Sequence, residues 1–166
     1  EVVLLDPERV ATYYGQGDEL HLSFNFSPMF GPWDPALWRH HIATTERTHN
    51  AVGAWPTWVL SNHDVPRYRT RYGGSEQLAR SAAVLLLGLR GTPFVYMGDE
   101  LGLEDAEVPD TAKVDPGGRD GCRAPIPWTR DEPHGWDGEP PWLPWSPESG
   151  ERSVEAQSDD PTSMLS

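Results

Sequence analysis

The hydrophobic positions of the first hundred residues follow two different periods. Between residues 19 and 26 they alternate strictly with polar positions, which predicts a β-strand with one apolar and one polar face. Between residues 76 and 90 they recur at helical spacing, and Ser75 and Gly91 stand where such a helix would begin and end. This mixture of periods indicates an α/β fold.

Two further helices are predicted from an Asp-Pro pair at their start. Aspartate is a favourable N-cap and proline fits the first helical turn, so Asp6-Pro7 and Asp34-Pro35 each mark a beginning. The first of these helices should end at Gly15, and the second should run towards Val52.

Three short apolar runs, at residues 1–5, 55–61 and 92–97, predict further strands. The resulting order is β-α-β-α-β-α-β with short connections, which favours parallel strands joined by crossover helices. Periodicity is lost after residue 104, where Pro, Gly, Trp and acidic residues dominate. We expect residues 104–166 to form a long loop region packed on the rest.

Side chains capable of chemistry follow the predicted strands. Asn62, His63 and Asp64 come directly after the run 55–61, and Asp99 and Glu100 come after the run 92–97. The carboxyl ends of parallel strands form the active face of α/β folds, so these residues are candidates for a site.

Each candidate also has a structural interpretation. Asp64 could cap a turn and pair with Arg67, and the residues alone leave this possibility open beside the functional one. For Asp99 and Glu100 they favour a structural role, either solvated or holding arginines. Arg123 could fork onto ligand hydroxyls or onto an acid of the site, or it could belong to a structural Arg–Asp pair.

Charge and cysteine content narrow the possible partners. Lys and Arg total 13 against 26 Asp and Glu, so the net charge of −13 disfavours nucleic acid and anionic membrane surfaces. It suits a neutral or cationic small ligand. The single cysteine, Cys122, excludes an internal disulfide and is expected to be a packed, unreactive thiol; we expect a cytoplasmic location.

No cofactor or metal is predicted. The chain has no phosphate-binding loop, no zinc-type Cys/His spacing and no nucleophilic-serine motif. Asp115 and Asp120 lack the spacing of a calcium-binding helix-loop-helix loop. The eight tryptophans, half of them after residue 125, could stack on sugar rings, although such residues more often hold irregular loops to a core.

Several motifs together resemble the α-amylase superfamily of glycosidases. The run Val59-Leu60-Ser61-Asn62-His63-Asp64-Val65-Pro66-Arg67 resembles the end of the seventh barrel strand, residues 91–102 resemble the eighth, and residues 21–26 match the sixth. The run Arg119-Asp120-Gly121-Cys122-Arg123-Ala124-Pro125-Ile126-Pro127-Trp128 resembles the following loop of the α-glucosidase and oligo-1,6-glucosidase branch. The resemblance covers nearly the whole chain.

This resemblance implies a (β/α)8 TIM barrel and retaining hydrolysis of a small α-glucoside substrate. By motif, Asp64 would stabilise the transition state, His63 would hydrogen-bond the same sugar ring, and Arg123 would be the cation of the substrate subsite. Glu1, followed by valine, matches the place of the general acid/base. The family's nucleophile is an aspartate of a Gly-x-Arg-x-Asp pattern, which would lie upstream of residue 1.

We therefore expect the C-terminal part of a catalytic barrel, from the end of strand 5 to strand 8, inactive alone. Residues 1–103 would supply βα units, and residues 104–166 would lead towards a further domain. Two alternatives remain: a transglycosylating relative such as a trehalose synthase or sucrose-acting enzyme, and a non-catalytic subunit resembling amino-acid-transporter heavy chains. A metal-dependent hydrolase using His63 and Asp64 is less favoured, because no further ligands have suitable spacing.

Overall fold

The computed structural model describes residues 2–166, which form two compact units. The first unit comprises the chain up to Leu60 together with Val84–Val95, and the second comprises Ser61–Ala83 and Tyr96–Ser166. No helix within residues 2–166 combines the length and the apolar character needed to cross a membrane.

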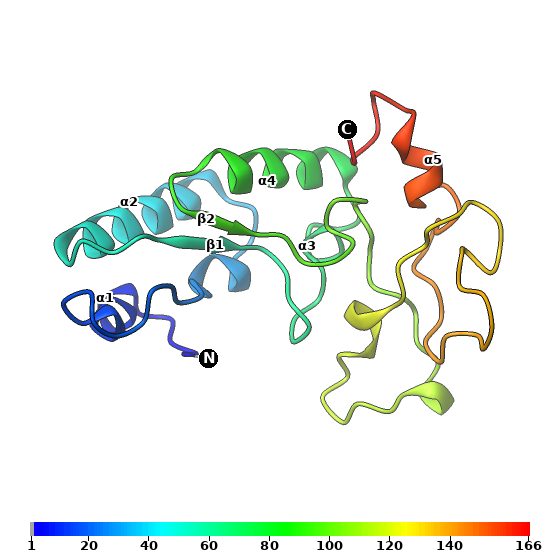
Figure 1. Cartoon of the computed structure of the whole chain (residues 1–166), viewed down its shortest axis with the longest axis horizontal. Helices are drawn as coiled ribbons and strands as arrows, with labels where there is room; N and C mark the ends of the chain where they lie inside the picture. The colour runs from blue at the N-terminus through cyan, green and yellow to red at the C-terminus, as the bar shows by residue number, and fades with distance from the viewer. Residues whose placement is uncertain (1) are drawn as a thin grey trace. The chain divides into compact units, whose positions relative to one another are not determined.

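The first unit contains the two helices predicted from Asp-Pro pairs (Figure 1). Helix α1 spans Pro7–Ala11 and continues as the 3-10 turn η1, Thr12–Tyr14; α2 spans Pro35–Ala51 after the 3-10 turn η2, Ser27–Phe30. The side chain of Asp6 accepts a hydrogen bond from the Glu8 amide, and that of Asp34 accepts one from the Leu37 amide at 2.7 Å. Both helix starts are thus confirmed, together with the caps that predicted them.

The sheet of the first unit is a single parallel pair. Strand β1, Thr57–Val59, pairs with β2, Thr92–Phe94, in a register that places Thr57 opposite Thr92 (Figure 1). All three residues of β1 are buried. Gly91 precedes β2 at a φ of +141°, and a Cβ there would lie 2.7 Å from the Trp58 indole nitrogen, so glycine is required. Both strands are confirmed, although they are shorter than the apolar runs.

Two of the four predicted strands are wrong. Residues 2–5 form no strand; Val3 and Leu5 are exposed, and the Leu5 carbonyl accepts from the Ser27 hydroxyl. Residues 19–26 are not part of a strand either, and they contain bends at Glu19 and His21. The Thr57 hydroxyl instead accepts from the Asn25 amide at 3.1 Å and donates to the Ser23 carbonyl at 2.6 Å. A side chain of β1 therefore takes the place of strand-to-strand hydrogen bonds.

The second unit is built mainly from loops around short helices. It contains α3, Tyr68–Arg71, which the pattern did not predict, the start of α4, Glu76–Gly88, the 3-10 turns η3, Asp110–Ala112, and η4, Asp120–Arg123, and α5, Val154–Ser158. Leu101, Leu103 and Ile126 form a buried apolar cluster, against which Val154 packs. Between residues 104 and 166 the only helical segments are η3, η4 and α5, and the division of the chain at residue 103 stays a prediction.

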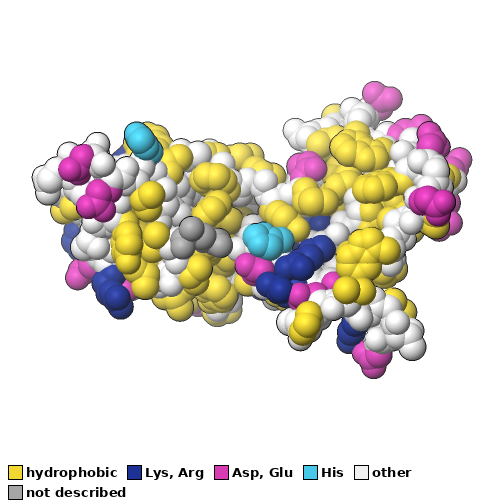
Figure 2. Space-filling view, turned by 60° about the horizontal axis from the view of Figure 1, so that its bottom comes forward, with side chains coloured by type: hydrophobic (Ala, Val, Ile, Leu, Met, Phe, Trp, Pro, Cys, Tyr) yellow, Lys and Arg dark blue, Asp and Glu magenta, His cyan; other side chains and the backbone are white. Residues whose placement is uncertain are grey.

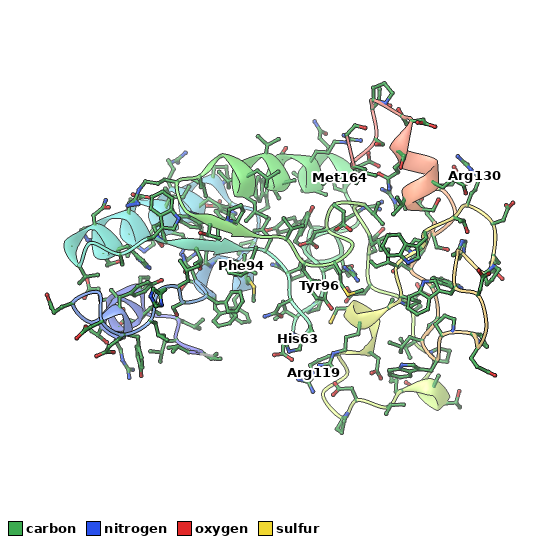
Figure 3. All side chains as sticks on the ribbon, in the orientation of Figure 1. His63, Phe94, Tyr96, Arg119, Arg130 and Met164 are labelled. Carbon is green, nitrogen blue, oxygen red and sulfur yellow. The ribbon has the colours of Figure 1, made fainter. Side chains whose placement is uncertain are left out.

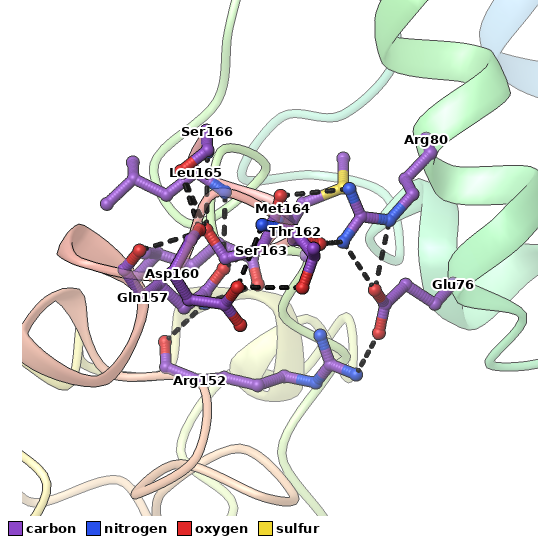
Figure 4. A network of polar contacts seen from close by, with 12 residues as sticks. Glu76, Arg80, Arg152, Gln157, Asp160, Thr162, Ser163, Met164, Leu165 and Ser166 are labelled. Carbon is purple, nitrogen blue, oxygen red and sulfur yellow. Dashed lines mark hydrogen bonds and ion pairs between the residues drawn. The ribbon is translucent and has the colours of Figure 1, made fainter.

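Arginine–acid pairs hold the C-terminal loops of the second unit together (Figure 4). Arg80 bonds Glu76 at 2.8 Å and donates to the carbonyls of Thr162 and Ser163. Arg152 lies between Glu76, at 2.9 Å, and Glu148, at 2.8 Å. In these loops, side-chain contacts connect segments that in a sheet would be connected by backbone hydrogen bonds.

Candidate active site

The side chain of Asn62 stabilises the turn in the loop that follows β1. Its side-chain oxygen accepts hydrogen bonds from the amides of Asp64 and Val65, at 2.9 and 3.1 Å. An asparagine that bonds the backbone two residues on is a common turn-forming device. Because Asn62 fixes the turn, the Asp64 carboxylate remains available for other partners.

The alternative pairing of Asp64 with Arg67 is wrong. Arg67 is 0% exposed; its guanidinium donates to the Met97 carbonyl and lies 5.1 Å from the centre of the Tyr96 ring. The Arg67 amide donates to Asp105 at 2.8 Å. Arg67 therefore anchors the end of the loop inside the second unit.

Asp64 is held instead by two arginines of a distant loop. Its Oδ1 lies 2.6 Å from Arg119 Nη1 and 3.4 Å from Arg123 Nη2, while its Oδ2 lies 3.5 Å from His63 Nε2. Arg123 Nε also donates to the His63 carbonyl at 2.9 Å. The structure thus brings His63, Asp64 and Arg123 together, and it adds Arg119, which the sequence did not single out.

A second carboxylate completes the group. Asp115 receives two hydrogen bonds from the Arg119 side chain, Nε to Oδ2 at 2.8 Å and Nη2 to Oδ1 at 2.5 Å, and Arg123 Nη1 lies 3.8 Å from the same Oδ1. We call Asp64, Arg119, Asp115 and Arg123 the charged quartet, because acids and arginines alternate around it. Hydrogen bonds from Arg119 lower the pKa of Asp115, so this carboxylate stays ionised.

The site is open to solvent. Figure 3 shows His63 and Arg119 close together, and Figure 2 shows histidine, basic and acidic side chains gathered at one place on the surface. The side chains of Asp64 and Arg119 are 38% and 39% exposed. Asp115 is the least exposed member, with 8% of its side-chain surface exposed. A ligand could therefore reach Asp64 and His63 directly.

The spacing of charged residues in the sequence could have indicated the pair Asp115 and Arg119. Asp115 and Arg119 stand four residues apart, and Arg119 and Arg123 again four apart. The sequence offered a structural Arg–Asp pair and a site arginine as alternatives for this loop. In the structure Arg119 pairs with Asp115 and with Asp64, and Arg123 Nη2 lies 3.4 Å from Asp64 Oδ1, so the site role of Arg123 stays a prediction.

Asp99 has the structural role that the sequence favoured. It is buried, and its Oδ2 accepts from the Tyr96 amide at 3.3 Å. Burial raises the pKa of Asp99 to about 7, although the charge of Arg67 and a hydrogen bond from Ser61 oppose the shift. Glu100 accepts from the Gly98 amide at 2.8 Å.

The other residues singled out from the sequence are Glu1, Cys122 and the tryptophans. Glu1 lies outside the described residues. Cys122 is buried and donates to the Arg119 carbonyl, and burial raises the pKa of its thiol to about 11, which confirms a packed thiol. Trp136 is exposed, as are Trp128 and Trp142, but its indole donates to the Ile126 carbonyl at 2.8 Å and so holds a loop.

The arrangement suits binding of hydroxyl groups. Asp64 Oδ2 and the His63 ring stand side by side, an acceptor beside a group that can donate or accept. An ionised carboxylate at this place can also stabilise positive charge in a transition state. Among residues 2–166, no three His, Cys, Asp or Glu side chains are grouped so as to hold a metal ion.

The chain is mixed α/β, with one short parallel strand pair, and the carboxylate–histidine–arginine group includes the residues that follow β1 in the sequence. The chain belongs to the α-amylase family, since the model of the α-amylase catalytic domain matches residues 4–166. This confirms the family expected from the strand-end motifs.

Individual relatives are α-glucosidases and related enzymes. The chain is 34% identical, over 95% of its length, to a probable α-glucosidase of Rhizobium meliloti, and 26% identical over 89% to an oligo-1,6-glucosidase of Parageobacillus thermoglucosidasius. It covers 31% and 34% of these proteins, so the chain spans about a third of the curated relatives it matches.

Solved structures show the same relationship. The α-glucosyl transfer enzyme XgtA superposes with a TM-score of 0.87 at 37% identity, over 96% of this chain and 31% of that one. The trehalulose synthase MutB of Pseudomonas mesoacidophila superposes with a TM-score of 0.83 at 23% identity, over 96% and 36%, and shares the fold. The chain is therefore part of an α-amylase-family catalytic domain.

Proposed function

We propose that this chain is the C-terminal part of the (β/α)8 catalytic domain of a retaining α-glucosidase that acts on small α-glucosides. The observation that carries the proposal is the position of Asp64, beside His63 and held by arginines on its far oxygen. In this proposal Asp64 stabilises the transition state and His63 binds a hydroxyl of the same ring. Arg123 orients both through the His63 carbonyl and Asp64 Oδ1.

The two oxygens of Asp64 would have separate tasks. Oδ1 takes both arginine contacts and so anchors the carboxylate, whereas Oδ2 faces His63 Nε2. Oδ2 and the imidazole would then bind neighbouring sugar hydroxyls. As the glycosidic bond breaks, the ring gains oxocarbenium character, and the fixed negative charge of Asp64 would lower the barrier electrostatically.

The remaining catalytic groups are assigned by the family motif. Glu1 would be the general acid/base that protonates the leaving oxygen, and a nearby negative charge would keep its pKa high enough for that task. The nucleophile would be an aspartate upstream of residue 1, about 5–5.5 Å from the acid, as retaining enzymes require. Residues 1–166 alone would then be inactive. A cytoplasmic location, resting on the single cysteine, stays a prediction.

The proposal is tested by the complete reading frame. DNA upstream of the Glu1 codon should encode a Gly-x-Arg-x-Asp motif, and the encoded enzyme should release glucose from maltose or isomaltose. Proton NMR during the first minutes should show α-glucose before mutarotation, the mark of retention. An upstream sequence without that aspartate, or initial release of β-glucose, would contradict the proposal.

A second candidate is transfer of a glucosyl group to an acceptor other than water. The similarity to XgtA, 37% identical and named as an α-glucosyl transfer enzyme, favours it. Both reactions share the first half, so they differ in what attacks the glucosyl-enzyme. Product analysis with maltose, isomaltose and sucrose separates them: hydrolysis yields only monosaccharides, whereas transfer also yields new disaccharides or longer products.

A further inference from the structure

Within the charged quartet, Asp115 is held by the backbone of its own loop, whereas Asp64 is exposed to solvent. The side chain of Asp115 is only 8% exposed, and its amide donates to Asp120 Oδ2 at 3.1 Å, as does that of Val114 at 2.8 Å. The Arg119 amide donates to Asp115 Oδ2 at 2.9 Å. The backbone around Asp115 is thereby set by the loop itself. Asp64, at the other end, is more than a third exposed.

Arg119 takes its orientation from Asp115. Two of its side-chain nitrogens, Nε and Nη2, bond the two oxygens of Asp115, and only Nη1 reaches Asp64. Such a two-point contact fixes the plane of a guanidinium, whereas one contact does not. The direction of the bond to Asp64 is therefore determined on the Asp115 side.

We propose that Asp115 is a positioning residue for Asp64, acting through the Arg119 guanidinium. This rests on the proposed function, in which Asp64 stabilises the transition state. Arg119 holds Oδ1 at 2.6 Å, and this contact leaves Oδ2 turned towards His63. Without the Asp115 charge, Arg119 is free to rotate and to take both oxygens of Asp64. The oxygen meant for the sugar is then occupied.

Kinetics of the enzyme encoded by the complete reading frame test this role. Asp115→Asn keeps the shape but removes the charge, and kcat should fall by about 10- to 100-fold while KM changes by less than about threefold. The matched control is Asp110→Asn, since Asp110 pairs with Lys113 at 2.6 Å in the same loop and has no link to Asp64 in the described contacts. That variant should keep the wild-type kcat.

A second variant guards against a simple folding defect. Arg119 is partly exposed, so Arg119→Gln should fold, and it should lower kcat to a similar extent. The double variant Asp115→Asn/Arg119→Gln should be no slower than Arg119→Gln alone, because both changes break one chain of contacts. Additive losses, or an Asp115→Asn enzyme as fast as Asp110→Asn, would overturn the proposal.

Hydrogen exchange separates this proposal from the proposed function. In Asp115→Asn, amides of residues 62–67 should exchange faster than in wild type, whereas Asp110→Asn should leave them unchanged. If the wild-type protein cleaves no α-glucoside but this difference is seen, the proposed function fails and the positioning role stands. If the protein is active and Asp115→Asn alters neither exchange nor kcat, the positioning role fails.

Discussion

Two charged clusters share the loop of residues 62–67, and they differ in their access to water. At its end, Arg67 is fully buried and Asp99, which feels its charge, is 4% exposed. At its centre, Asp64 and Arg119 keep more than a third of their side-chain surface exposed. We call the buried group, Arg67 and Asp99, the dry cluster, and the solvent-exposed group, Asp64 and Arg119, the wet cluster.

The number of hydrogen bonds does not follow burial. Arg67 Nε and Nη2 and Asp99 Oδ1 find no hydrogen-bond partner within residues 2–166, whereas Arg119 is bonded at three side-chain nitrogens. Solvent screens the wet cluster, so its bonds orient groups more than they stabilise the fold. Burial makes every charge of the dry cluster costly to change. We infer that the dry cluster controls stability and the wet cluster controls the geometry of the site.

The largest effect is expected for Arg67→Ala. The change leaves a cavity, removes the donor to the Met97 carbonyl and leaves Asp99 without its nearby cation. The free energy of unfolding should fall by about 3–5 kcal/mol, measured by urea titration. A loss below about 1 kcal/mol would mean that the dry cluster is not what secures the loop.

Asp99 should make stability fall as pH rises. Its folded pKa of about 7 lies above the ordinary value of 3.8, so the folded protein holds a proton that the unfolded chain releases. This contribution is fully present below about pH 4 and is lost as pH rises through 7, by up to roughly 4 kcal/mol. Asp99→Asn removes the titration.

The difference between the wild-type and Asp99→Asn unfolding free energies isolates this effect from the other acids. It should decline between pH 4 and 8 and then level off. A difference that is flat over this range would contradict the raised pKa.

A smaller effect is expected where the ion pairs are half-buried. Arg152, 12% exposed, bridges Glu76 and Glu148, so Arg152→Ala should cost about 1–3 kcal/mol. Arg130→Ala is the matched control, because its pair with Glu151 is exposed and should contribute less than about 0.5 kcal/mol. Equal losses in thermal unfolding would remove burial as the deciding variable.

Local features of the fold could be predicted because their causes lie within a few residues. The Asp6 and Asp34 caps act on amides two or three positions away, and the α4 pattern repeats along one helix face. Residues 19–26 were misassigned because alternation shows which face is apolar, but not which group the backbone will hydrogen-bond. In the structure the Asn25 amide and the Ser23 carbonyl bond the side-chain hydroxyl of Thr57 and not a neighbouring strand.

Of the candidate site, the sequence pattern alone predicted only the residues that follow β1. The polar end of β1 marked His63 and Asp64, but the bond from Arg119 to Asp64 spans 55 positions and that from Arg152 to Glu76 spans 76. No periodicity links residues so far apart, and only folding brings them together. The resemblance to a family supplied Arg123 by motif. The four-residue spacing could have paired Arg119 with Asp115, but only the structure shows that Arg119 also contacts Asp64.

The most direct test of the account is the kcat/KM of Asp64→Asn in the enzyme encoded by the complete reading frame, with maltose or isomaltose as substrate. Asparagine keeps the shape and removes the negative charge that would stabilise the transition state, so kcat/KM should fall at least about 100-fold while the unfolding temperature is preserved. A correctly folded Asp64→Asn enzyme with kcat/KM within about threefold of wild type would contradict the role of Asp64.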